Sequence, residues 1–207
     1  EIDLDRAGGR TIGEVTLPYR PAVGAALVAG AYENETPVIH RIPPFRPGVP
    51  RLRDDRPQGG KRVIGGPFQR LILPLRGFPR VLPVQVVRVG GVAVVGLPFE
   101  LTVETGRRIE AAVADRVAGH GVGRVVVTSV TNEYAGYCTT PEEYAEQRYE
   151  GGHTLYGPST QPFVAAHAAR LAGDTVRDGL VCDLVPDRPF DLHHHRYLPA
   201  GGGPSVE

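Results

Sequence analysis

The chain contains neither methionine nor tryptophan, and Lys61 is its only lysine. Its 23 Lys and Arg residues balance 23 Asp and Glu residues, so no polyanionic partner such as nucleic acid is favoured. No apolar run approaches the ~20 residues that span a bilayer, and we recognise no signal peptide. A globular domain is therefore expected, and 207 residues can bury a core of useful size.

Cysteine is scarce as well. Cys138 and Cys182 are too few for a disulfide scaffold and lack metal-site spacing, so we expect Cys138 to be a small buried residue. The HExxH, GxSxG, P-loop and CxxC motifs are all absent from the sequence, and the mechanisms tied to them have no local support. Because Glu1 stands where an initiator methionine would, we expect the chain to be a piece of a longer protein.

The clearest secondary-structure signal is VLPVQVVRVGGVAVVGLP, residues 81–98. Its β-branched runs on either side of a Gly-Gly pair predict two strands joined by a tight turn. The segment LTVETGRRIEAAVADRVAGHG then predicts a helix capped by Thr102, with Val103, Ile109, Val113 and Val117 on one face. Residues 124–132 predict a strand of the buried type.

Two further helices are predicted. TPEEYAEQRYEG has Thr140 as its N-cap and Pro141 at the first helical position, and PSTQPFVAAHAARLAG follows it. The front of the chain predicts short β segments, including AVGAALVAGAY, then an exposed loop at 41–62 and an edge strand in RLILPLR. This order favours the α/β class, with a mixed sheet and flanking helices.

Polar residues follow two of the predicted strands directly. Glu100 comes after VVGLP, and residues 131–137 come after RVVVTSV. Functional residues gather at the carboxyl ends of strands, because loops converge there on a rigid scaffold. From spacing alone, Glu100 is better explained as a first-turn carboxylate that stabilises the helix dipole than as a catalytic residue.

The stretch TNEYAGYCTTPEEYAEQRYEGGHTLYGP, residues 131–158, holds five of the eight tyrosines and His153. Tyrosine packs well, but it also binds metals or donates a hydrogen bond to an oxyanion, and spacing does not choose among these roles. His153 has no His or Cys partner close by in the sequence. The consecutive residues His193, His194 and His195 would point to alternating sides of an extended tail, so only adventitious metal binding is expected there.

The same stretch resembles a signature of the neutral/alkaline (non-lysosomal) ceramidase family, approximately N-x-Y-x-x-Y-x-T-T-x-E-E-Y-x-x-Q-x-Y-E-G-x-x-T-x-Y-G-P. The upstream segment LPVQVVRVGGVAVVGLPFELTVETGRRIEAAV is similar to the family's LPVQ strand and its PGE-x-T-x-x-x-G-R-R-L segment, and RPAVGAALVAGAY resembles a further element. The match is strongest across 81–158. It implies that residues 1–188 are the C-terminal half of a larger catalytic domain. The sequence from Pro186 on has the composition of a tail that leaves the domain, so 189–207 are expected to be flexible.

Members of this family are zinc amidohydrolases that split ceramide into sphingosine and a fatty acid, with the zinc held by two histidines, a glutamate and a tyrosine. The resemblance implies that Glu100 and Tyr137 are metal ligands and that Tyr149 is a catalytic residue holding the substrate's oxygen. It also implies a lipid amide substrate, a role in sphingolipid metabolism, an extracellular or membrane-associated location, and peripheral membrane contact.

Three departures from the family pattern stand out. Phe99 replaces the glycine of PGE, and His153 stands where small residues are usual. The A-H-T-H-S-G-P and G-D-V-S-P segments are not present in the sequence, so a missing N-terminal half would supply both zinc histidines, and the chain alone is expected to be inactive. The alternative is a non-catalytic remnant of the same fold that binds a lipid or a protein.

Overall fold

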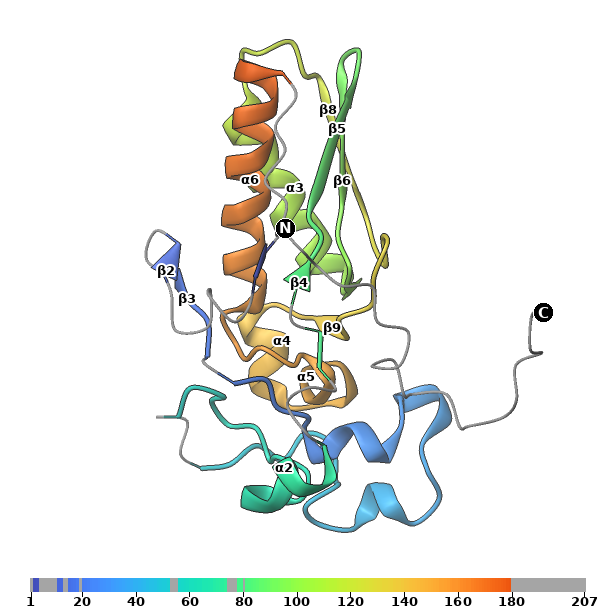
Figure 1. Ribbon diagram of the computed structural model, residues 1–207. Helices are drawn as coiled ribbons and strands as arrows, with labels where there is room; N and C mark the ends of the chain where they lie inside the picture. The colour runs from blue at the N-terminus through green and yellow to red at the C-terminus, as the bar shows by residue number, and fades with distance from the viewer. Residues whose placement is uncertain are drawn as a thin grey trace, which may run out of the picture.

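The structure is a computed structural model that describes residues 2–3, 11–12, 15–18, 20–52, 56–73, 78–79 and 81–179. The predicted tail at 189–207, Cys182 and the three consecutive histidines lie outside these residues. The long helices α3 (Val103–Val117) and α6 (Thr160–Asp178) run side by side along a narrow sheet, above a layer of short helices and loops (Figure 1). Within the described residues, no helix has the length and apolar content needed to cross a bilayer.

The sheet contains the three strands β5 (Gln85–Val89), β6 (Val92–Gly96) and β8 (Arg124–Thr128). β5 and β6 form an antiparallel hairpin around the Gly90–Gly91 turn, and β6 pairs in parallel with β8. Gly90 has a φ of 58°, a conformation that glycine adopts without steric cost. The predicted mixed α/β architecture is therefore confirmed.

Only one face of this sheet is covered by the described elements. α6 packs along β5 and α3 along β8, and Val95 and Val125 are buried beneath them. The opposite face exposes Val87, Val89 and Val126. The strand predicted within residues 124–132 is confirmed over Arg124–Thr128. Its predicted buried type was wrong, because side chains alternate between the two faces and only one face has a helical layer over it.

Helix α3 follows its sequence signals closely. The Thr102 hydroxyl accepts a hydrogen bond from the Thr105 amide at 3.4 Å, which caps the first turn as predicted. Ile109, Val113 and Val117 are buried at helical spacing, and the helix ends just before Gly119. Val103 differs from the prediction: it is the first residue of the helix and is 74% exposed.

The segment that begins at Thr140 forms two short helices, α4 (Pro141–Glu146) and α5 (Tyr149–His153). Thr140 and Glu143 make a reciprocal capping box at the start of α4, which confirms the predicted N-terminus. Gln147 then adopts a left-handed conformation with a φ of 51° and ends the first helix. The chain changes direction at Gln147, so α5 starts at Tyr149 as a separate helix with its own axis.

The front of the chain departs most from its predicted structure. The segment AVGAALVAGAY contains the 3₁₀ helix η1 (Ala25–Ala29) and part of η2 (Tyr32–Asn34). The described part of RLILPLR, residues 70–73, includes most of α2 (Gln69–Ile72) in place of an edge strand. Gly24 explains the compact turns, because its amide donates to the Gly152 carbonyl oxygen at 2.7 Å. A Cβ at Gly24 would lie only 2.8 Å from the Gly152 Cα, so a strand-forming side chain has no room there.

Outside the candidate active site, the remaining described elements are short: β1 (Ile2–Asp3), β2 (Thr11–Ile12), β3 (Val15–Thr16), η3 (Ile39–Arg41), η4 (Gly66–Phe68) and β4 (Val81–Leu82).

The predicted exposed loop at 41–62 ends in a buried anchor. Lys61 is only 2% exposed, and its ammonium group donates to the carbonyl oxygens of Ala22 at 3.0 Å and Thr154 at 2.6 Å. The same group lies 4.9 Å from the centre of the Tyr144 ring. Burial lowers the pKa of Lys61. Lys61 thus ties together the segments that contain Ala22, Tyr144 and Thr154 in the layer of short helices and loops below the sheet, called the lower layer from here on. The prediction that the loop at 41–62 is exposed was wrong at this end.

Candidate active site

The two predicted metal ligands lie side by side on paired strands. β7 (Glu100–Leu101) and β9 (Tyr137–Cys138) run parallel, with Glu100 directly opposite Tyr137. The Glu100 amide donates to the Gly136 carbonyl oxygen at 3.0 Å. The two strands follow β6 and β8, whose parallel pairing brings their carboxyl ends together. Both residues therefore lie where the sheet's strand ends meet.

The first-turn explanation of Glu100 was wrong. Helix α3 begins at Val103, and its first-turn carboxylate is Glu104. Glu100 lies in β7, half-buried, before the N-cap residue Thr102. Its carboxylate is therefore placed by strand pairing and is available to a site at the sheet edge.

Tyr149 and Tyr134 complete a cluster around this pair. The ring of Tyr149, the first residue of α5, meets the Tyr137 ring edge-on with centres 5.7 Å apart. The Tyr134 hydroxyl donates a 2.8 Å hydrogen bond to Oε1 of Glu100. The structure thus brings together all three residues that were singled out, Glu100, Tyr137 and Tyr149, and adds Tyr134 as a direct partner of the carboxylate.

His153 lies against the same cluster. Its ring centre is 5.9 Å from that of Tyr137 and 6.1 Å from that of Tyr134. Its Nδ1 atom is buried and has no hydrogen-bond partner among the described residues. Burial and then the charge of Lys61 lower the pKa of His153, which the Glu100 carboxylate opposes. A neutral imidazole is the form that binds metal ions.

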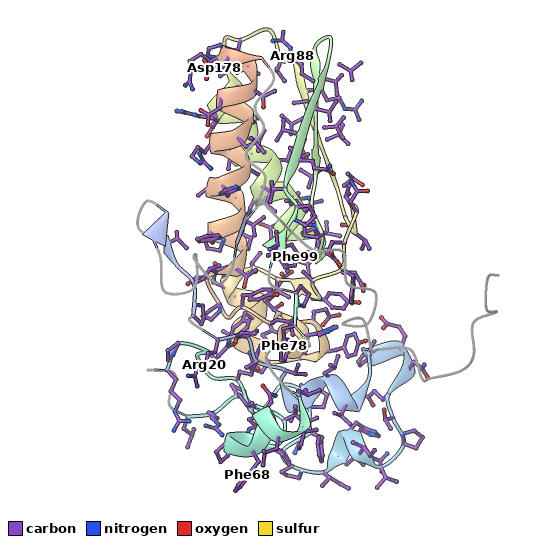
Figure 2. The ribbon with its side chains drawn as sticks, in the orientation of Figure 1. Arg20, Phe68, Phe78, Arg88, Phe99 and Asp178 are labelled. Atoms are coloured by element: carbon purple, nitrogen blue, oxygen red, sulfur yellow. The ribbon has the colours of Figure 1, made fainter. Side chains whose placement is uncertain are left out.

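The remaining tyrosines of the stretch, Tyr144 and Tyr156, have packing roles. Tyr144 is buried, and its hydroxyl donates to the Gln58 carbonyl oxygen at 2.8 Å. The Tyr156 hydroxyl donates to the Pro79 carbonyl oxygen at 2.7 Å. Phe99 is fully buried and meets the Tyr156 ring edge-on at 6.4 Å, where the sheet joins the lower layer (Figure 2). The bulk that Phe99 adds therefore enters the core and not the site.

The surroundings of Tyr134 and Tyr137 keep these two phenols neutral. Burial raises the pKa of Tyr137 and of Tyr134, and hydrogen bonding to the Glu100 carboxylate raises both further. A neutral phenol next to a carboxylate is a hydrogen-bond donor, and a cation placed between them would favour the phenolate instead. The cluster therefore suits either a hydrogen-bonded or a metal-bound state.

The cluster contains types of donor atom that zinc binds. Zinc accepts carboxylate oxygen and imidazole nitrogen, and the phenol of Tyr137 is a further oxygen donor. The structure describes no group of three or more His, Cys, Asp or Glu side chains that could hold a metal ion. The candidate metal ligands are therefore of three types. The Glu100 carboxylate and the Tyr137 phenol are paired across β7 and β9, and the unpartnered Nδ1 atom of His153 lies beside them.

Sequence reasoning did not find the bond between Tyr134 and Glu100 or the position of His153. The signal for His153 was its spacing from Tyr149, because residues four apart lie on one face of a helix. That signal was missed because the predicted helix TPEEYAEQRYEG ended at Gly151, before His153, whereas α5 runs to His153.

Comparison with known proteins identifies relatives across most of the chain. A family model for neutral/alkaline non-lysosomal ceramidase, N-terminal, matches residues 50–166. The neutral ceramidase of Pseudomonas aeruginosa is 37% identical over 150 residues, which are 68% of this chain and 22% of that protein. The neutral ceramidase of Mycobacterium tuberculosis is 36% identical over 202 residues, which are 92% of this chain and 31% of that protein.

The structural comparison agrees. A solved ceramidase complexed with C2 matches with a TM-score of 0.54 and 34% identity over 76% of this chain and 25% of that one. A neutral ceramidase from Pseudomonas aeruginosa matches with a TM-score of 0.55 and 30% identity, covering 77% of this chain and 24% of that one. The chain spans less than a third of the length of these relatives. Because the family model covers more than half of the 207-residue chain, the chain belongs to the neutral/alkaline non-lysosomal ceramidase family.

Proposed function

We propose that this chain is part of a zinc-dependent amidohydrolase that cleaves the N-acyl bond of ceramide to give sphingosine and a fatty acid. The observation that carries the proposal is the pairing of Glu100 with Tyr137 across β7 and β9, with the Tyr149 ring 5.7 Å from the Tyr137 ring. Membership of the ceramidase family supports the reaction type and a ceramide substrate.

Each side chain has a distinct role in this proposal. A bound zinc ion would lower the pKa of water and polarise the amide carbonyl. Glu100 and Tyr137 supply the two oxygen ligands, and Tyr134 orients Glu100 through its 2.8 Å hydrogen bond. Tyr149 donates a hydrogen bond to the substrate oxygen as negative charge develops on it.

Two imidazole ligands are proposed to come from polypeptide outside this chain, which carries part of the metal site only. The relatives are more than three times as long as the matched region, so they have room for such a segment. An extracellular or membrane-associated location and peripheral contact with a membrane belong to the same proposal, since ceramide is a lipid.

The isolated 207-residue chain is expected to bind zinc weakly and to hydrolyse no ceramide. Complete structural zinc sites contribute about 10–16 kcal/mol. A site that lacks two of its imidazoles should stay below about 8 kcal/mol, which corresponds to a Kd weaker than about 1 μM. Isothermal titration with Zn²⁺ measures this affinity directly. Tight binding of one equivalent would contradict the proposal.

The alternative is a lipid- or protein-binding remnant that keeps the fold without the chemistry. The reading frame immediately upstream of Glu1 separates the two functions. A segment of the A-H-T-H type there, together with release of fatty acid from ceramide by the longer protein, would support the enzyme. A longer protein that lacks this segment and releases no fatty acid would favour the binding module.

A further inference from the structure

We propose that His153 is a third metal donor of this site, so that Glu100, Tyr137 and His153 together bind a divalent transition metal such as Zn²⁺ or Co²⁺. The inference rests on the proposed metal site and adds a nitrogen ligand that this chain itself supplies. It assigns a role to a histidine that stands where the family pattern has a small residue.

The geometry of α5 directs His153 to the same place as Tyr149. Residues at positions i and i+4 of a helix lie on one face, one turn apart. In agreement, both rings contact Tyr137, with centres at 5.7 Å for Tyr149 and 5.9 Å for His153. The three rings are therefore in contact around Tyr137, and a shared ion would need ligand bonds of about 2.0–2.2 Å.

The buried Nδ1 atom of His153 is the observation that points to a ligand. A buried polar atom without a partner costs about 1–3 kcal/mol, and such atoms are rare in folded proteins. The neighbouring Tyr134 hydroxyl donates to Glu100 and is therefore engaged elsewhere. A bound metal ion would offset this cost by accepting the nitrogen lone pair.

The backbone near His153 allows its ring to approach Tyr137 closely. Gly136, the residue before β9, has a φ of 78°, and an added Cβ would lie 2.7 Å from the His153 carbonyl oxygen and 3.4 Å from Cδ2 of its ring. Only glycine therefore lets Tyr137 and His153 come together. On the other side, Lys61 donates to the Thr154 carbonyl oxygen at 2.6 Å and holds the end of α5 in place.

Titration of the 207-residue chain with Co²⁺, followed by visible absorption and calorimetry, tests this assignment without any activity assay. His193, His194 and His195 are replaced by Gln in every sample, so that the tail contributes no binding. His153→Phe keeps a ring in place but removes both nitrogens, and His153→Gln is a second variant in case one of them fails to fold. Circular dichroism checks folding.

We expect both variants to weaken Co²⁺ binding by about 10-fold or more and to change the absorption band, because a nitrogen ligand is lost. His120→Gln, in the exposed turn after α3, is the matched control and should bind as the parent does. Unchanged affinity in a folded His153 variant, or no Co²⁺ binding at millimolar concentration, overturns the inference. If Glu100→Gln and Tyr137→Phe still abolish binding while His153→Phe does not, only the role of His153 fails. If none of the three matters, the proposed metal site fails with it.

Discussion

Glu100→Gln and Tyr137→Phe, made in the complete enzyme that contains this chain, are each expected to lower zinc affinity and ceramide hydrolysis by at least about 100-fold. Loss of a residue that only supports a ligand already costs about 10–100-fold, and loss of the ligand itself should cost more. The two side chains face each other across β7 and β9, so neither can take the place of the other. Metal analysis after dialysis and ceramide turnover provide the two measurements.

Two further tyrosine variants separate the loss of a metal ligand from the loss of a supporting hydrogen bond. Tyr134→Phe removes only the hydrogen bond to Glu100, so we expect a loss of about 10–100-fold in zinc affinity. Tyr156→Phe removes a hydroxyl that bonds to the Pro79 carbonyl oxygen and should leave zinc content unchanged. Normal zinc content in both Glu100→Gln and Tyr137→Phe would refute the ligand assignment.

Phe99→Gly, which restores the residue of the family pattern, is expected to destabilise this chain by about 3–5 kcal/mol. Removing a buried Phe side chain costs that much through lost burial and a residual cavity. Phe99 is 0% exposed and meets the Tyr156 ring edge-on in the core. Urea denaturation of the wild-type and variant chains, followed by circular dichroism, measures the free energy of unfolding.

Phe68 supplies a matched control, since it is 66% exposed in η4. Phe68→Gly should change the free energy of unfolding much less than Phe99→Gly, because its ring is already largely in water; backbone effects of glycine add about 1 kcal/mol. A neutral or stabilising effect of Phe99→Gly would show that the core tolerates the family's glycine. In that case the bulk of Phe99 would need another explanation.

Local signals account for the parts of the fold that the sequence predicted well. The hairpin needs only β-branched runs around Gly90 and Gly91, and α3 needs only a cap and an apolar face. The capping box at Thr140 is likewise complete within four residues. The pairing of Glu100 with Tyr137 could be anticipated because both follow strands of one sheet, while their roles came from the family resemblance.

Contacts between distant segments decided the features that the sequence did not reveal. The acceptors of Lys61 lie 39 and 93 residues away, so its burial has no local signature. The 3₁₀ turns of η1 depend on the close approach of Gly24 to Gly152. The partner of Tyr134 is 34 residues away, and His153 lies in α5, beyond the end of the predicted helix.

The burial of Lys61 has a practical consequence for work in solution. Since it is the only lysine in the chain, no ε-amino group is accessible while the lower layer is folded. Amine-reactive labels and crosslinkers can then attach to the folded chain only at its α-amino group. A second labelled amine, read by intact mass, therefore reports opening of the lower layer, which makes this residue a built-in probe of unfolding.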